Sequence, residues 1–503
     1  MSENNLNFDF FNAKNGEQTC RLNGKYFHSA YAPSKEAQTF CNSIECTFKP
    51  SCVIILEPAL SFCAAFLRKI FPSVELIAIR FTDVFCKTDS LWDKVFYFFQ
   101  TENFAQKLYS ALGEEKILSA LILDWPGSKN IFPEISNSAW KEIKTAVLTA
   151  RDVLYTREKF AKRWFLNSLA FCKFGQDFYS LCRIKKDILI TASGPSLSSS
   201  IKNIKKYREN FFLIAVSSSL SVLLYNKIFP DLVISTDGGF WAKKHLELNR
   251  EDLKKLKDTV FALTDEANCP KYILQNQKIL PLAYPSSIGE KIFTDSKIEF
   301  LPALRNGTVS GTAAAFALRL TQKNVYFCGL DLAENSGFQH AQPNMLEKNS
   351  QNKDFRLETK EKRQVSSRFN SKGSLEIYRS WFKNQGINFR ERLFRLSDNY
   401  NFSEKLGQIK DLSWEELVFD KKNADFDSTT EVFFKTKNSA EKKEFESRFF
   451  KILESGDFDG ELFPLESILL AREFDEEKKN GQKLKIQQKK AELAEKIRRL
   501  FDE

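Results

Sequence analysis

The turn at residues 192–197, with the sequence ASGPSL, carries the clearest chemical signal in this chain. The apolar run 188–190 precedes it, and a helix-like pattern follows it. A strand, a tight turn and a helix in this order point free backbone N–H groups at a ligand above the turn, which favours a phosphate. Gly194 lets the backbone approach a ligand, Pro195 fixes the turn, and Ser196 can donate a hydrogen bond or cap the helix. We expect a phosphate or nucleotide contact here, the alternative being an ordinary turn.

A second glycine-containing segment, RNGTVSGTAAAFAL at residues 305–318, leads into an alanine-rich helix. Ser310 and Thr312 fall near the N-terminus of this helix, where the helix dipole stabilises an anion. The alternative is a helix cap in which small residues allow close packing. The candidate ligand-binding residues of this segment are Gly307, Thr308, Ser310, Gly311 and Thr312.

Two aspartates and one histidine are suited to metal or proton chemistry. Asp237 and Asp331 each follow a strand-like run, where a carboxylate can hold Mg²⁺, bind a ribose hydroxyl or cap a turn. His340 lies in a polar loop after the last of these runs, and the chain has only 3 histidines. Histidine is the side chain that titrates near neutral pH without special help. His340 is therefore the candidate general base, against the alternative of an ordinary surface histidine.

The elements that must position these residues form an alternating series. Six short runs, apolar on both faces, are separated by helical patterns, which is typical of a parallel, doubly wound sheet. In such sheets ligands bind beyond the carboxyl ends of the strands, so the polar segments there, including Ser217 after the second run, are expected to line one crevice. The six predicted strands span residues 187–191, 211–216, 232–235, 260–263, 279–282 and 325–328.

The N-terminal region contains a second strand pattern. Residues 51–81 predict a strand, a turn, a helix and a strand, which is a βαβ unit. The turn at 57–61 (EPALS) has no glycine, so a dinucleotide or similar cofactor is not expected there. Residues 103–122 and 133–182 look mostly helical, and the C-terminus has a stripe of Leu and Ile at helical spacing.

These patterns divide the chain into three parts. We predict an α/β protein whose central domain, residues 183–395, holds a Rossmann-like parallel sheet with helices on both faces. An α/β domain with a degenerate Rossmann-like unit precedes it at residues 1–182. A helical region follows at residues 396–503.

Composition excludes several classes of protein. The net charge is +10, but lysines alternate with acidic residues and no nucleic-acid motif is present, so nucleic-acid binding is not expected. The N-terminus has no basic and apolar signal, and no apolar run reaches the length of a membrane span. The 10 cysteines form no CxxC motif, and several lie in apolar runs. A soluble, reduced, cytoplasmic protein is expected.

Taken in order, the motifs resemble the landmarks of a known domain. ASGPSL, FPDLVISTDGG, GTVSGTAAAFALRL, VYFCGLDLA and FQHA resemble the DUF115 (MptE-like) domain, in the version found in motility accessory factors, the Maf proteins linked to flagellin glycosylation. The segment SAYAPSKEAQTF at residues 29–40 looks like the N-terminal segment of that family. The resemblance covers the chain to about residue 395.

The resemblance implies a sialyltransferase-like fold and site. Maf central domains are similar to metal-independent bacterial sialyltransferases, whose motifs match residues 193–197, 309–311 and 329–331 here. Ser193 stands where those enzymes have asparagine, and their phosphate-assisting tyrosines have no match in ENSGFQHA. The implied catalytic residues are His340 and Asp331, and the implied nucleotide- or phosphate-binding residues are Ser193, Gly194, Pro195, Ser196, Ser217, Asp237, Gly307, Thr308, Ser310, Gly311, Thr312 and Gly329.

What the resemblance implies is a glycosyltransferase that moves a CMP-activated nonulosonic (sialic-acid-like) sugar to Ser or Thr of flagellin. His340 would remove the hydroxyl proton, while the turn at 194–196 and Ser310 would hold the leaving CMP phosphate. No tightly bound metal is expected. The archaeal pterin branch of the same domain implies an alternative, a pyrophosphokinase that uses ATP and Mg²⁺. A further alternative is a non-catalytic flagellin-binding protein.

Overall fold

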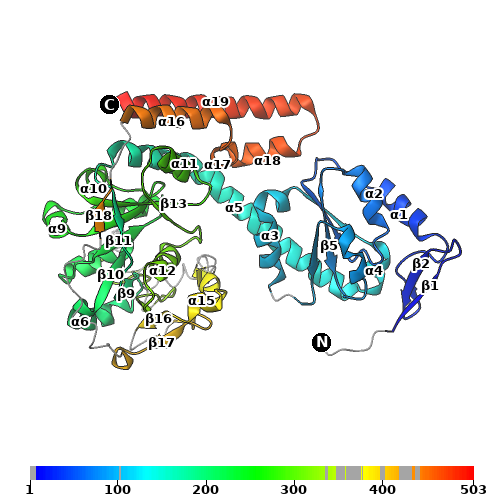
Figure 1. Cartoon of the computed structure of the whole chain (residues 1–503), viewed down its shortest axis with the longest axis horizontal. Coiled ribbons are helices and arrows are strands. Elements are labelled where there is room, and N and C mark those ends of the chain that lie inside the picture. Colours follow the sequence, from blue (N-terminus) through cyan, green and yellow to red (C-terminus); the bar gives the residue numbers. More distant parts are fainter. Residues whose placement is uncertain are drawn as a thin grey trace. The chain divides into compact units, whose positions relative to one another are not determined.

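The chain divides into two compact units, which are drawn in Figure 1. Unit 1 comprises Met1–Ala161 and Asp459–Ala491, and unit 2 comprises Lys162–Phe458 and Glu492–Glu503. Two long helices, α5 (Pro133–Phe174) and α19 (Glu476–Asp502), contribute residues to both units. The computed structural model describes residues 7–100, 103–334, 338–346, 357, 375–376, 378–396, 403–417, 433–436 and 442–502.

Unit 1 is built on a parallel sheet with the strand order β6-β5-β4-β7. Its strands are β4 (Cys52–Leu56), β5 (Glu75–Arg80), β6 (Lys94–Tyr97) and β7 (Ala120–Asp124). A small antiparallel sheet is formed by β1 (Phe8–Asn12), β2 (Gln18–Leu22) and β3 (Lys25–Tyr26). The helices of unit 1 include α1 (Pro33–Asn42), α2 (Cys63–Ile70), α3 (Phe104–Leu118), α4 (Pro126–Ile131), α17 (Asp459–Leu462) and α18 (Pro464–Arg472).

The predicted βαβ unit at residues 51–81 is confirmed by β4, α2 and β5. The prediction that residues 103–122 are mostly helical is wrong at its end, because α3 stops at Leu118 and β7 begins at Ala120. A short apolar run such as ALILD does not distinguish a strand from a helix by its periodicity. Residues 120–124 form a strand because they pair in parallel with β4.

Unit 2 holds a sheet whose nine described strands all run parallel, in the order β14-β13-β12-β11-β10-β9-β15-β16-β17. The six predicted strands are confirmed as β9 (Asp187–Thr191), β10 (Phe211–Val216), β11 (Leu232–Ser235), β12 (Val260–Thr264), β13 (Lys278–Ala283) and β15 (Val325–Cys328). The sheet also contains β14 (Leu301–Pro302), β16 (Leu393–Leu396) and β17 (Lys410–Leu412). Separately, β8 (Tyr179–Leu181) pairs antiparallel with β18 (Phe433–Lys435).

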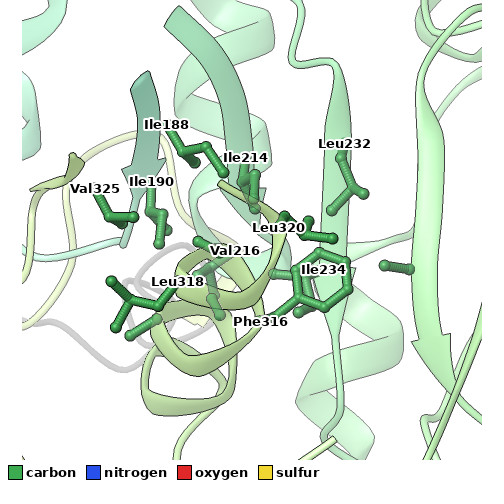
Figure 2. Close-up of a cluster of buried hydrophobic side chains, with 14 of the residues drawn as sticks. Ile188, Ile190, Ile214, Val216, Leu232, Ile234, Phe316, Leu318, Leu320 and Val325 are labelled. Carbon is green, nitrogen blue, oxygen red and sulfur yellow. The ribbon is translucent and has the colours of Figure 1, made fainter. Parts of the chain in front are cut away.

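The core of unit 2 lies between the sheet and helix α12 (Figure 2). Phe316, Leu318 and Leu320 of α12 pack on isoleucine and valine side chains of the central strands. Burying a side chain of this kind stabilises the fold by about 1.5–3 kcal/mol. The other helices of unit 2 include α6 (Leu197–Lys206), α7 (Leu220–Tyr225), α8 (Phe240–His245), α9 (Arg250–Lys255), α10 (Lys271–Asn276), α11 (Ile288–Asp295), α15 (Ile387–Arg390) and α16 (Lys442–Ser455), while α12 itself spans Val309–Leu320.

The predicted fold class, a Rossmann-like parallel sheet with helices, is confirmed. Residues 396–503 contain four helices among those described, α16 to α19, and they divide between the two units. The division of the chain into domains at residues 182 and 395 stays a prediction. Within the described part of the chain, no helix is long and apolar enough to span a membrane.

Candidate functional site

The strand order of unit 2 identifies where a ligand would bind. The chain runs outward from β9 through β10 to β14, then returns to β15 on the other side of β9. The sheet therefore has a topological switch point between β9 and β15. In open parallel sheets, ligands bind in the crevice beyond the carboxyl ends of the strands at such a point. The ASGPSL turn follows β9, and Gly329 to Asp331 follow β15.

Two helices begin at this edge of the sheet. α6 follows the turn after β9, and α12 connects β14 to β15. These two crossovers run in opposite directions across the sheet. Because parallel crossovers are right-handed, α6 and α12 cover opposite faces, with both N-termini at the carboxyl edge. The predicted crevice is thus flanked by two helix N-termini.

A buried pair joins the two turns at the switch point. The Asp331 carboxylate accepts hydrogen bonds from the Ser196 backbone N–H, at 2.7 Å, and from the Ser196 hydroxyl. Asp331 is fully buried and Ser196 is 4% exposed. Burial raises the pKa of Asp331, while the Ser196 hydrogen bonds and the charge of Arg395 act in the opposite direction. The carboxylate occupies the place at the start of α6 where an anion would otherwise bind, so in this structure Asp331 positions the turn.

Two glycines allow the turns to interlock. The Gly194 N–H donates to the Gly329 carbonyl at 2.8 Å. A Cβ at Gly194 would lie 2.5 Å from Asp331 Oδ2, and a Cβ at Gly329 would lie 2.4 Å from the Ala192 carbonyl oxygen. Gly329 also has a φ of +72°, in the left-handed region that favours glycine. Both predicted glycines are therefore required by close approach, whatever ligand binds.

The second predicted segment forms the start of α12. Thr308 is the N-cap residue and makes no side-chain capping bond, so the first N–H groups of α12 are not capped by it. The Thr312 hydroxyl is used by the segment before the helix, because it donates to the Leu304 carbonyl at 2.9 Å. Ser310 is 8% exposed. Gly307 is exposed and has a φ of +76°.

A helical segment at residues 378–383 lies against both motifs, and sequence reasoning missed it. Arg379 Nη1 donates to the Leu332 carbonyl at 2.7 Å, just after Asp331. A Cβ at Gly311 would lie 2.9 Å from the Trp381 ring. Tyr378 lies beside Gly307, and burial, followed by the negative charge of Asp237, raises its pKa. Asp237 itself is exposed, and its carboxylate accepts a hydrogen bond from the backbone N–H of Gly239 at 2.7 Å.

The segment that contains His340 lies next to the ASGPSL turn. The Ala341 N–H donates to the Ser193 carbonyl at 2.8 Å. A second histidine, His245, lies at the end of α8. Burial, and then the charge of the nearby His340, lower the pKa of His245 to about 4. Sequence reasoning noted that histidines are scarce but did not place His245 at this edge.

Hydroxyl groups surround Ser193. The Ser218 hydroxyl donates to the Ser193 hydroxyl at 2.9 Å, and Asn344 donates to the Ser218 carbonyl. The predicted residue Ser217 is 3% exposed, and its neighbour Ser218 contributes the hydroxyl seen at this edge. The predicted residues thus converge on one edge of the sheet, with Ser193, Gly194 and Pro195 partly exposed on it.

A cavity of about 450 Å³ opens beside this turn, over α6 and α7. Ser198, Ser199 and Gln342 line it, and the Gln342 amide donates to the His340 carbonyl. Lys202 and Lys205 also line it, and none of the described residues in its lining is acidic. The cavity therefore suits an anionic ligand.

The two aspartates do not form a ready magnesium site. Both oxygens of Asp331 accept from Ser196, and Oδ1 of Asp237 accepts from Gly239. Among the described residues, no group of three or more His, Cys, Asp or Glu side chains is arranged to hold a metal ion.

The sequence is similar to a known domain family and to two proteins of one bacterium. Residues 163–337 match the family described as 6-hydroxymethylpterin diphosphokinase MptE-like. A protein of Treponema pallidum (strain Nichols), described only as uncharacterized, is 29% identical over 294 residues, which are 58% of this chain and 63% of that protein. A second uncharacterized protein of the same organism is 23% identical over 220 residues, or 42% of this chain and 37% of that one. The matched stretch is thus less than two thirds of the length of either relative.

A solved structure has the same fold. It is that of the MAf glycosyltransferase from Magnetospirillum magneticum AMB-1, with a TM-score of 0.56 and 13% sequence identity. The similarity covers 98% of this chain and 90% of that chain. At this level of identity the likeness concerns the fold.

Proposed function

Because the chain is a Maf-like protein that carries an MptE-like domain, we propose that it is a glycosyltransferase whose active site lies at the β9/β15 switch point. The donor is a CMP-activated nonulosonic sugar, and the acceptor is a Ser or Thr hydroxyl of flagellin. The Ser196–Asp331 pair is the observation that carries the proposal, because it fixes the two motif-bearing turns against each other at this point.

The charge of the site supports an anionic donor. A CMP-nonulosonate carries a phosphate and a carboxylate, and Lys202 and Lys205 line the cavity beside the ASGPSL turn without an acidic neighbour in its lining. Lysine binds such groups as a point charge. The size of the cavity, about 450 Å³, falls in the range of small-molecule sites.

Groups other than Ser196 would hold the leaving phosphate. Because both Ser196 donors are used by Asp331, we assign this role to the Ser193 hydroxyl, the uncapped first turn of α12 with Ser310, and the Tyr378 phenol. Tyr378 supplies the kind of donor that ENSGFQHA lacks. It comes from a later segment of the chain.

Transfer would be a direct displacement. His340 takes the proton of the acceptor hydroxyl as its oxygen forms a bond to the anomeric carbon of the sugar. The bond between that carbon and the phosphate oxygen breaks, and CMP leaves with both electrons. The backbone bond between Ala341 and Ser193 would keep His340 next to the donor site.

Thermal unfolding with added CMP tests the donor site. A ligand that binds only the folded state raises the melting temperature by mass action. At a ligand concentration of about 100 times Kd, the free energy of unfolding rises by about 2.7 kcal/mol. CMP without metal should stabilise the chain, and the double variant Lys202→Ala/Lys205→Ala should lose most of that effect. Lys254→Ala/Lys257→Ala makes the same change in charge elsewhere in unit 2 and should keep it.

Flagellin transfer tests the base. His340→Gln should still be stabilised by CMP but should not transfer sugar, whereas the Lys254→Ala/Lys257→Ala variant should transfer normally. The family description favours one other function, a pyrophosphokinase. Stabilisation by ATP with Mg²⁺ alone would support that function and refute ours. No response to any nucleotide would instead favour a non-catalytic flagellin-binding protein.

A further inference from the structure

The sheet of unit 1 has a switch point of its own. The chain runs from β4 through β5 to β6 and later returns to β7, on the other side of β4. The place for a ligand in such a sheet is beyond the carboxyl ends of β4 and β7. Here the chain itself covers that place: the Trp125 indole, after β7, donates to the Phe27 carbonyl at 2.7 Å. The Leu60 N–H, after β4, donates to His28 Nε2 at 3.1 Å.

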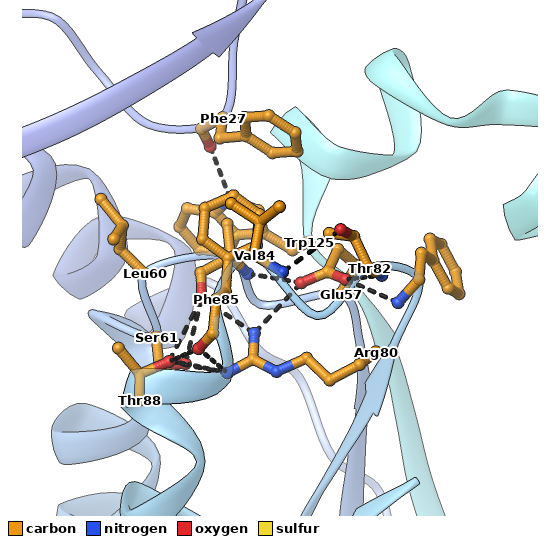
Figure 3. Close-up of polar contacts among 12 residues, drawn as sticks. Phe27, Glu57, Leu60, Ser61, Arg80, Thr82, Val84, Phe85, Thr88 and Trp125 are labelled. Atoms are coloured by element: carbon orange, nitrogen blue, oxygen red, sulfur yellow. Dashed lines mark hydrogen bonds and ion pairs between the residues drawn. The ribbon is translucent and has the colours of Figure 1, made fainter. Parts of the chain in front are cut away.

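A buried ion pair fills the space beneath this cover (Figure 3). Arg80 and Glu57 are both fully buried, with Arg80 Nη1 3.1 Å from Glu57 Oε1. Glu57 also accepts from the backbone N–H groups of Ala59, Phe81 and Thr82. The N–H groups that would face a phosphate in a nucleotide-binding turn are therefore used by a carboxylate of the chain, and a nucleotide site here is closed.

A cavity of about 370 Å³ lies on the outer side of the covering segment. Its lining includes Lys14, Tyr26, His28, Tyr31 and Glu36. Backbone bonds frame it: the Lys14 N–H donates to the Ala30 carbonyl, and the Asn15 N–H donates to the Tyr31 carbonyl. The Glu36 carboxylate accepts from the Ser29 N–H at 2.7 Å, which fixes the start of α1 against the same segment.

His28 forms the buried wall of this cavity. Its Nε2 accepts a hydrogen bond, so in the neutral imidazole the proton is on Nδ1. Burial lowers the pKa of His28 to about 3, which keeps the ring neutral. Nδ1 has no hydrogen-bond partner among the described residues, and it faces Glu36 Oε2 at 3.9 Å, beyond hydrogen-bond reach.

The remaining groups of the lining define the chemistry of the ligand. The positive charge of Lys14 and the negative charge of Glu36 offset each other, so the cavity does not select an anion such as a phosphate. Tyr26 and Tyr31 are 44% and 63% exposed, and they present ring faces and hydroxyls together. The Lys14 ammonium lies 4.4 Å from the centre of the Tyr31 ring. Ring faces beside paired donors and acceptors match a ring that has C–H groups on its faces and hydroxyls at its edge.

We propose that this cavity is a second ligand site that binds one neutral sugar ring. The ring packs on Tyr31, and its hydroxyls bond to Glu36 and Lys14. The site is in unit 1 and is separate from the donor site in unit 2, so it would bind sugar without a nucleotide.

Saturation-transfer NMR on the full chain tests this site. The probes are N-acetylglucosamine and galactose, which are neutral, with N-acetylneuraminate as the anionic comparison. We expect signals from at least one neutral sugar and none from the anion. Tyr31→Ala should abolish the signals, and Glu36→Gln should reduce them at least tenfold, on the order of one lost charge-assisted hydrogen bond. Tyr225→Ala removes a still more exposed tyrosine from unit 2 and should leave the signals unchanged.

Three results would overturn the proposal: no signal from a neutral sugar, signals that persist in Tyr31→Ala, or signals that CMP displaces. The last would locate the sugar in unit 2. Because Tyr31 is exposed, its removal should leave the melting temperature unchanged, which separates lost binding from lost folding. The CMP response of Tyr31→Ala should equal that of the wild type, so this site and the donor site can fail independently.

Discussion

Ser196 donates both its backbone N–H and its hydroxyl to the carboxylate of Asp331, across 135 residues of sequence. The two residues come from turns on either side of the switch point of the main sheet. The pair therefore joins β9 to β15 at the edge where both strands end, and it sets the shape of the crevice before any ligand binds.

Loss of this carboxylate should cost more than loss of the serine hydroxyl. Asp331→Ala leaves two buried donors of Ser196 without a partner, and we expect a loss of about 2–3 kcal/mol of unfolding free energy. Ser196→Ala removes one donor and keeps the N–H bond, so it should cost about 1 kcal/mol. Urea unfolding of both variants and of the double variant measures the coupling between them. Equal losses in the two single variants would contradict the role of Asp331 as a clamp.

The two interlocked glycines should not tolerate a methyl group. Gly194→Ala would bring Cβ to 2.5 Å from Asp331 Oδ2, and Gly329→Ala would bring it to 2.4 Å from a backbone carbonyl, with a strained φ in addition. We expect both to lower stability, by about 1–3 kcal/mol, with the larger effect at Gly329. Gly481, inside α19, has nothing within 4 Å of its would-be Cβ. Gly481→Ala should instead stabilise the chain by about 0.5–1 kcal/mol, and thermal unfolding of the three variants compares them directly.

The sequence was sufficient for six of the nine described strands of the main sheet and for the edge where they end, because these depend on local patterns, but it missed β14, β16 and β17. Each of the six central strands is a short run of β-branched and apolar residues, and polar residues follow where each one ends. The edge residues Gly194, Asp331 and Gly329 could thus be predicted to converge before their contacts were known. Their individual contacts could not, since the pairing of Ser196 with Asp331 depends on packing between turns far apart in the chain.

The missed residues lack any such local pattern. Tyr378 and Arg379 lie in an ordinary amphipathic helical stretch, and only the folded chain brings them to Gly307 and Leu332. His245 ends a short helix with two lysines before it, which looks like a solvated surface, yet it is 8% exposed. The strand β7 was missed because a run of four apolar residues followed by an aspartate fits either a helix or a strand.

The ion pair in unit 1 provides a prediction on buried charge. Arg80→Met would leave the Glu57 carboxylate fully buried without its partner, and we expect a loss of about 3–5 kcal/mol. Arg21→Met breaks an exposed pair with Asp9 in the same unit and should leave the unfolding free energy nearly unchanged. Chemical unfolding followed by tryptophan fluorescence measures both. A loss at Arg80 as small as that at Arg21 would mean that Glu57 becomes protonated or solvated without cost.

Two buried histidines should make the chain lose stability in mild acid. Burial lowers the pKa of His28 to about 3 and, as the larger of two causes, that of His245 to about 4, whereas both titrate near 6.5 when unfolded. Between these values the unfolded chain binds more protons, so stability is fully present above about pH 6.5 and falls as the pH falls towards 4. At about pH 5 each histidine should have lowered the free energy of unfolding by about 2 kcal/mol, since one pKa unit corresponds to about 1.4 kcal/mol.

Urea unfolding between about pH 7 and about pH 5 measures this loss while most carboxylates remain charged. His28→Gln keeps an acceptor for the Leu60 N–H but cannot be protonated, so it should lose about half of the pH dependence. Burial raises the pKa of Glu36, beside His28, and a raised carboxyl pKa adds stability as the pH falls, which partly offsets the effect near the acid end of the range. An unchanged slope in His28→Gln would mean that the imidazole reaches water, or a charged partner, when it takes up its proton.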